Sequence, residues 1–214
     1  MRPIHSVSGA AIPFGVPNVD TDLIVPGRYL KDIDRSRLAA SAFYALRYDE
    51  DGALRPDSPF DGPGRTGAPI LVAGANFGCG SSREQAAWAL AEMGIYVVIA
   101  PSFAEIFAGN AFKNGILLVE LPVQSVARLM GVACNHEIHV DLPAQTITTP
   151  LGDHFTFEVD PFRKTCLMEG LDEIELTEGM EAEIMAYEAR VRSQRPWADA
   201  PPRHMEPTSK SGTA

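Results

Sequence analysis

The run Gly-Cys-Gly-Ser-Ser-Arg, which begins at Gly78, carries the residue types in this chain that are most able to do chemistry. Gly78 and Gly80 permit a tight turn that brings the backbone close to a ligand. A helix that begins at Ser81 or Ser82 would direct unpaired N–H groups and the positive end of its dipole at an anion. Arg83 adds a planar fork that suits a carboxylate. The run therefore predicts a carboxylate or phosphate site with a serine hydroxyl beside it.

The same serines have a purely structural interpretation. Ser81 with Glu84, and Ser82 with Gln85, both have the spacing of a helix capping box. The lysine of a phosphate-binding loop is absent, and the dinucleotide pattern G-x-G-x-x-G is not met, which argues against a nucleotide. Spacing alone leaves capping and catalysis open.

Other polar residues give weaker signals. Asp20 and Asp22 could suggest a metal, but two carboxylates without further ligands are poor evidence, and caps or Asx turns are the expected role. The histidines of the region expected to form strands are interpreted as structural: His136, His139 and His154.

Composition limits the possible partners. The chain has 214 residues, a net charge of −10 and 45% apolar residues, which suits one globular domain, alone or with an appendage. The negative charge argues against nucleic acid and anionic membranes as partners, and it means that an anionic substrate needs a local basic site. We find no secretory h-region and no apolar run of membrane-spanning length.

The cysteines indicate a reducing compartment. Cys79, Cys134 and Cys166 are odd in number and widely spaced, so they predict no disulfide framework and fit the cytoplasm. Their spacing also lacks the clustering typical of an iron–sulfur site, so no metal or cofactor is expected on this chain. Cys79 is interpreted as a small filler of the glycine turn, and its role stays open.

Two kinds of hydrophobic pattern follow along the chain. Residues 69–74 and 96–100 read as buried strands on either side of a helix over 83–93, which predicts a parallel βαβ unit. The next expected elements are a helix over 102–115 with a capping box at Ser102 and Glu105, a strand over 116–121 and a helix over 122–133.

Alternating patterns then predict antiparallel strands between residues 137 and 160. Asp160 and Pro161 predict the start of a short helix, and a last helix is expected over 178–193. Residues 34–48 are expected to be helical and 49–68 to form a loop. We predict one mixed α/β domain over 1–195 and a disordered tail over 196–214.

Four segments, in the right order, resemble one family. They are NVDTDLIVPGRYL (18–30), NFGCGSSREQAAWAL (76–90), VVIAPSFAEIFAGNAFKNGILLVEL (97–121) and FRKTCLMEGLDEIELT (162–177). The second resembles the G-x-G-S-S-R-E-H segment of the swivelling domain of the aconitase superfamily. All four resemble the 3-isopropylmalate dehydratase small subunit family.

The resemblance implies a swivelling β/β/α fold and a hydro-lyase of leucine biosynthesis. Members of the family act in complex with a large subunit, which carries a [4Fe–4S] cluster, and they isomerise 2-isopropylmalate and 3-isopropylmalate through isopropylmaleate. The resemblance makes Ser81 the catalytic base, acting as its alkoxide, and places Ser82 and Arg83 at substrate-binding positions. Arg28 or Lys31 would meet the substrate in the recognition loop, and the alternative for Arg28 is a solvated surface charge.

This chain departs from the family pattern at several positions. Lys31 stands where many relatives have arginine, Gln85 where they have histidine, Ala87 where they have proline and Glu169 where they have asparagine. These departures keep two alternatives open. One is a paralogous hydro-lyase for citramalate, dimethylmalate or homoaconitate, and the other is a non-catalytic anion-binding module.

Overall fold

The computed structural model describes residues 1–30, 38–195 and 197, which form two compact units divided after Asp172. The second unit contains α8 (Glu173–Glu178) and α9 (Glu181–Gln194). The predicted single domain over 1–195 stays a prediction, and the predicted disorder of the tail falls outside the described residues except at Trp197. Within the described ranges, no helix is long and apolar enough to cross a membrane.

A parallel sheet forms the centre of the first unit. Its strands lie in the order β2-β3-β4-β5, with bounds Ala11–Phe14, Ile70–Ala73, Val97–Ala100 and Leu117–Glu120. All neighbouring strands are parallel, which confirms the βαβ unit predicted from residues 69–100. Such strands are buried on both faces, and so they read as continuous aliphatic runs.

An antiparallel sheet covers one face of the parallel sheet. Its strands lie in the order β1-β6-β7-β8, with bounds Ser6–Gly9, Ile138–Asp141, Thr146–Thr148 and His154–Thr156. The pairing confirms the antiparallel strands predicted between residues 137 and 160. Only Ala10 separates β1 from β2, so one stretch of chain serves both sheets.

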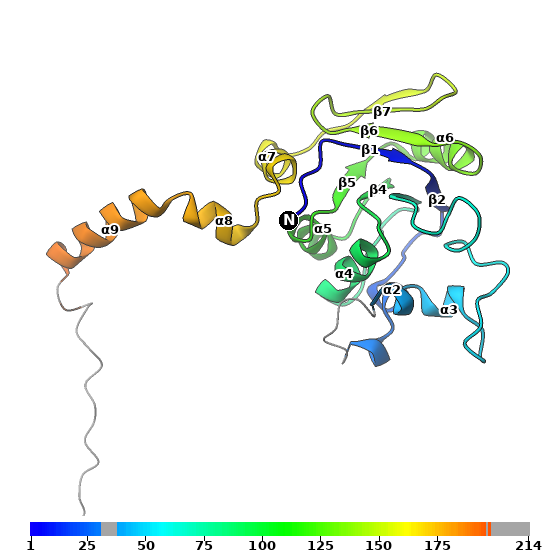
Figure 1. The fold of residues 1–214 in the computed structure, drawn as a ribbon, viewed down its shortest axis with the longest axis horizontal. Coiled ribbons are helices and arrows are strands. Elements are labelled where there is room, and N and C mark those ends of the chain that lie inside the picture. Colours follow the sequence, from blue (N-terminus) through cyan, green and yellow to red (C-terminus); the bar gives the residue numbers. More distant parts are fainter. Residues whose placement is uncertain (31–37, 196, 198–214) are drawn as a thin grey trace, which may run out of the picture. The chain divides into compact units, whose positions relative to one another are not determined.

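Alternation along the parallel strands produces two cores. Figure 1 shows the antiparallel strands β6 and β7 on one side of the parallel sheet. Ile70, Val97 and Leu117 face the antiparallel sheet and α6 (Val123–Ala133). Leu71 and Val98 face the opposite way, toward α4 (Glu84–Glu92) and α5 (Glu105–Lys113). Each fully buried aliphatic side chain contributes about 1.5–3 kcal/mol, so the two cores fix the sheet on both faces. The layers confirm the predicted β/β/α fold.

Short helices surround this core. Four of them lie between β2 and β3 in the sequence: α1 (Thr21–Ile24), the 3-10 helix η1 (Gly27–Tyr29), α2 (Leu38–Ser41) and α3 (Tyr44–Arg47). The fifth, α7 (Pro161–Glu169), follows β8. The helix predicted over 34–48 is interrupted at Phe43, whose φ of 50° is left-handed, and its first part lies outside the described residues. The predicted loop over 49–68 contains no helix or strand.

The two predicted capping motifs have different outcomes. Asp160 caps α7 as predicted, because its carboxylate accepts a hydrogen bond from the Arg163 N–H at 3.0 Å. The capping box at Ser102 is wrong, since α5 begins at Glu105 with Ala104 as an N-cap that has no side-chain bond. The Ser102 hydroxyl instead accepts a hydrogen bond from the Asn76 N–H at 2.9 Å. The Ser102 hydroxyl therefore bonds the loop residue Asn76, which is distant in sequence, and does not cap α5.

Candidate functional site

Three loops meet at the carboxyl ends of β2, β3 and β4, where ligands bind in open parallel sheets. The Asn18 N–H donates to the Ala75 carbonyl, and the Gly78 N–H donates to the Val19 carbonyl, both at 2.8 Å. The Phe77 N–H donates to the Ser102 carbonyl at 3.1 Å. These main-chain bonds fix the glycine run in place, so its serines are presented from a rigid support.

Gly78 is required by the packing of this loop. Its φ is +79°, and a Cβ added there would lie 2.2 Å from Cγ of Phe107 on α5. The loop therefore approaches α5 more closely than any residue with a side chain would allow. The sequence prediction of a tight glycine turn is confirmed at this position.

The helix after the turn begins within one residue of the start predicted for residues 83–93, and after both serines. α4 begins at Glu84, its N-cap is Arg83 in an extended conformation, and no side chain caps it. The expectation of a helix start at Ser81 or Ser82 is therefore wrong, and so are both capping boxes. Thr21 supplies the physical reason, because its hydroxyl donates to the Ser81 carbonyl at 2.9 Å and holds that residue in the loop.

The two serine side chains are exposed, and neither hydroxyl forms a hydrogen bond with any described residue. Ser81 and Ser82 are adjacent to Arg83, whose guanidinium is mostly covered, with 18% of the side chain exposed. Because capping does not occupy them, the Ser81 and Ser82 hydroxyls are available for a ligand. The interpretation of the two serines as caps of α4 is therefore wrong.

Arg83 is held by α1. Its Nη1 donates to the carboxylate of Asp22 and makes a longer contact of 3.5 Å with the Val25 carbonyl. Nε and Nη2 form no hydrogen bond within the described ranges, so one edge of the fork stays available for a carboxylate. Sequence reasoning missed Asp22 in this role, because only the fold brings the two residues together.

The other aspartate has the predicted structural role. Asp20 caps α1, and its Oδ1 accepts a hydrogen bond from the Leu23 N–H at 2.7 Å. Among the described residues, no group of three or more histidine, cysteine or carboxylate side chains could hold a metal ion. Asp20 and Asp22 are therefore committed to a cap and to an ion pair.

The remaining predicted substrate residues lie in the segment after α1. Arg28 is an exposed residue of η1, and its guanidinium stacks against Tyr29 and Tyr44. No hydrogen bond joins Arg28 to the Ser81–Arg83 segment within the ranges described. Lys31 lies outside the described residues.

A model of the aconitase C-terminal domain matches residues 1–124, and one described as LeuD_N matches residues 127–161. The 3-isopropylmalate dehydratase small subunit of Novosphingobium aromaticivorans is 55% identical over 92% of this chain and 95% of its own length. The corresponding subunit of Zymomonas mobilis is 53% identical over 92% of this chain and 100% of its own. The chain belongs to the 3-isopropylmalate dehydratase small subunit family.

A solved structure of this small subunit family has the same fold. The crystal structure of 3-isopropylmalate dehydratase (leuD) from Methanocaldococcus jannaschii is 28% identical, has a TM-score of 0.64 and covers 85% of this chain and 99% of its own. A member of the dehydratase family is a subunit of a hydro-lyase, so the family membership confirms the enzyme class predicted from the sequence.

Proposed function

We propose that this chain is the small subunit of a 3-isopropylmalate dehydratase of leucine biosynthesis. With a large subunit it would interconvert 2-isopropylmalate and 3-isopropylmalate by loss and re-addition of water through isopropylmaleate. The relatives named 3-isopropylmalate dehydratase small subunit support the assignment at 53–55% identity. The observation that carries a catalytic role for this chain is the exposed Ser81 hydroxyl, which no described residue occupies, beside the fixed guanidinium of Arg83.

The reaction needs a base and a fixed cation. A proton must leave the carbon next to a carboxylate, and Ser81 would accept it as an alkoxide. The positive end of α4, which begins three residues later, and the charge of Arg83 would favour that anion. The free edge of Arg83 would bind the carboxylate, and Ser82 would donate to the same substrate.

The hydroxide that leaves the neighbouring carbon needs an acid or a metal. We propose that the large subunit supplies a Lewis acid from a [4Fe–4S] cluster. Cys79, Cys134 and Cys166 are all free and lie in the loop after β3, at the end of α6 and within α7. Among the described residues, they belong to no group of side chains that could hold a metal ion. Three free cysteines suit a reducing compartment, and we propose the cytoplasm.

The test is anaerobic reconstitution of the full chain with its large subunit. We would follow isopropylmaleate absorbance with isopropylmalate, citramalate, dimethylmalate and homoaconitate as substrates. Strong preference for isopropylmalate is expected, and the chain without its partner should be inactive. Preference for another substrate would indicate the paralogous hydro-lyase, since one methylene in a pocket changes preference by only about 1–3 kcal/mol. No turnover of any substrate would contradict the proposal.

A further inference from the structure

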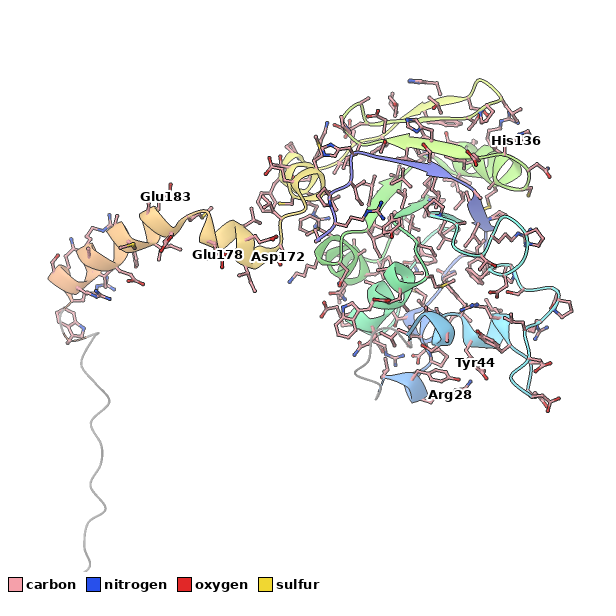
Figure 2. The ribbon with its side chains drawn as sticks, viewed as in Figure 1. Arg28, Tyr44, His136, Asp172, Glu178 and Glu183 are labelled. Carbon is pink, nitrogen blue, oxygen red and sulfur yellow. The ribbon has the colours of Figure 1, made fainter. Side chains whose placement is uncertain are left out.

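Arg28 is an exposed cation whose guanidinium is oriented by two aromatic rings. Its Cζ lies 4.9 Å from the ring centroid of Tyr29 and 4.8 Å from that of Tyr44. Figure 2 shows Arg28 and Tyr44 lying together. Arg28 pairs with no carboxylate in the part of the chain that the structure describes. Stacking holds the plane of a guanidinium and leaves its N–H edge free for a carboxylate.

The stack extends beyond Arg28 into α3. The Tyr44 ring lies 5.3 Å from that of Tyr29 and 4.7 Å from that of Tyr48, with which it stacks at 28°. The Arg47 guanidinium in turn lies 5.3 Å from the Tyr48 ring centroid. Tyr44 therefore connects Arg28 with a second arginine at the far end of α3.

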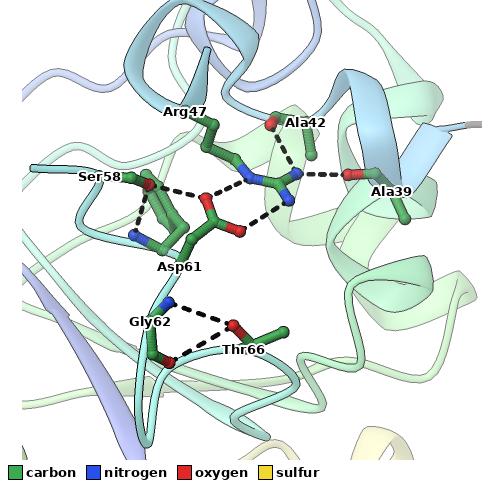
Figure 3. A network of polar contacts seen from close by, with 8 residues as sticks. Ala39, Ala42, Arg47, Ser58, Asp61, Gly62 and Thr66 are labelled. Atoms are coloured by element: carbon green, nitrogen blue, oxygen red, sulfur yellow. Dashed lines mark hydrogen bonds and ion pairs between the residues drawn. The ribbon is translucent and has the colours of Figure 1, made fainter. Parts of the chain in front are cut away.

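That second arginine is fixed by a largely buried ion pair (Figure 3). Arg47 donates from Nε and Nη2 to the two carboxylate oxygens of Asp61 at 2.9 and 3.0 Å. Its Nη1 donates to the carbonyls of Ala39 and Ala42 at 2.6 and 3.2 Å. The Ser58 hydroxyl donates to Asp61 at 2.7 Å. These hydrogen bonds join α2, α3 and the loop over 49–68, and so α3 holds Tyr44 in a rigid position.

The stack of Arg28, Tyr29 and Tyr44 lies beside a surface hollow. Arg28 and Tyr29 belong to η1, which follows α1 in the chain. Arg28, Tyr44 and Arg55 line a cavity of about 520 Å³, and the acidic residues Asp49 and Glu50 also line it. Arg28 lies three residues after Val25, whose carbonyl contacts Nη1 of Arg83. A dicarboxylate needs two cationic partners on this acidic chain, and Arg28, which pairs with no carboxylate among the described residues, lies on the same segment.

We propose that Tyr44 is a positioning residue, which holds the Arg28 guanidinium for the second carboxylate of the substrate. The Arg47–Asp61 ion pair fixes α3, the helix that carries Tyr44. The inference rests on the proposed function, because it assigns Arg28 a contact with the dicarboxylate substrate.

The test measures KM and kcat for isopropylmalate in the reconstituted complex. Tyr44→Leu should raise KM about fivefold with kcat changed less than twofold, because it removes one cation–π contact. Tyr44→Phe keeps the ring and should restore the wild-type KM. Arg28→Ala should raise KM about tenfold, because it removes a charged hydrogen bond. The double variant Arg28→Ala/Tyr44→Leu should be no worse than Arg28→Ala alone.

A matched control is the Arg–Tyr stack at the other end of the parallel sheet. Arg2 lies 4.6 Å from the Tyr96 ring centroid, just before β4 begins, and Tyr96→Leu should leave KM unchanged. If Tyr44→Leu fails to fold, Tyr29→Leu removes the neighbouring ring that also contacts Arg28 and tests the same stack. An unchanged KM in these ring variants, or additive effects of Tyr44→Leu and Arg28→Ala, would overturn the positioning role. Failure of the wild-type complex on every substrate would instead overturn the proposed function.

Discussion

The guanidinium of Arg83 donates through Nη1 to the carboxylate of Asp22, which lies 61 residues earlier in the chain. The pair joins the residue before α4 to the first turn of α1, and both lie where the parallel strands end. The ion pair neutralises part of the Arg83 charge but also fixes the plane of its fork. Arg83 is thereby prepared to bind a carboxylate without first losing side-chain entropy.

We expect Arg83→Lys to raise KM for isopropylmalate by about 10- to 100-fold, because a point charge replaces a fork that holds two oxygens. Asp22→Asn should raise KM less, since the guanidinium remains but loses its fixed orientation. The Asp22 side chain is 56% exposed, so breaking this pair should cost only about 0–1 kcal/mol of stability. Steady-state kinetics and thermal unfolding of each variant check this, and a large loss of stability for Asp22→Asn would show a mainly structural pair.

Ser81→Ala should lower kcat by about 100- to 10,000-fold, because it removes the proposed base. Stability should change by less than about 0.5 kcal/mol, since the hydroxyl neither caps α4 nor bonds a described side chain. Ser82→Ala serves as the comparison and should mainly raise KM. The measurement is kcat of the reconstituted complex together with its assembly by gel filtration. Retained activity in Ser81→Ala would remove Ser81 from the mechanism.

Gly78→Ala should destabilise the first unit by more than about 3 kcal/mol, because the new Cβ would overlap Phe107 at a left-handed backbone position. Gly109→Ala is the control. Gly109 lies within α5 with nothing within 4 Å of an added Cβ, so the change should stabilise by about 0.5–1 kcal/mol. Urea unfolding of the two variants compares them directly, and equal effects would show that the close approach does not matter.

Asp61→Asn should destabilise the protein by about 2 kcal/mol at neutral pH, because Arg47 loses a charged partner. Burial by itself would raise the pKa of Asp61, but hydrogen bonds from Arg47 and Ser58 outweigh it, and the pKa is lowered overall. A lowered pKa gives stability that is present above the carboxyl's ordinary value of about 3.9 and is lost as the pH falls through the folded value. The difference between wild type and variant should therefore be constant from about pH 5 to 7 and shrink at lower pH.

The control for this pH dependence is Asp57→Asn. Asp57 also pairs with an arginine, and the hydrogen bond that its carboxylate accepts from Arg55 lowers the Asp57 pKa. The Asp57 side chain is 73% exposed, so solvent screens the pair and little change in stability is expected. Urea unfolding as a function of pH distinguishes the two sites, and a constant Asp61→Asn effect down to pH 2 would contradict the assignment.

Much of the fold follows from local pattern. The aliphatic runs at Ile70 and Val97 have a helix between them. This order predicts parallel strands, because two parallel strands need a crossover connection, which is usually a helix. The alternation around Ile138 and Ile147 predicts antiparallel strands with one buried face. Asp160 before Pro161 predicts a helix start. Each of these signals depends on neighbours in sequence, and each agrees with the structure.

The site required the tertiary structure at each point where distant residues compete with local ones. Ser81 and Ser102 both have capping spacing, yet neither caps, because Thr21 holds the first residue and Asn76 the second. The sequence by itself determined the glycine turn, the serines, the arginine and the family they resemble. Only the fold decided that Asp22 holds Arg83, and that the neighbouring rings of Tyr44 and Tyr29 both contact Arg28. Hydrogen bonds and ring contacts form between atoms that are close in space, and separation along the chain does not specify that distance.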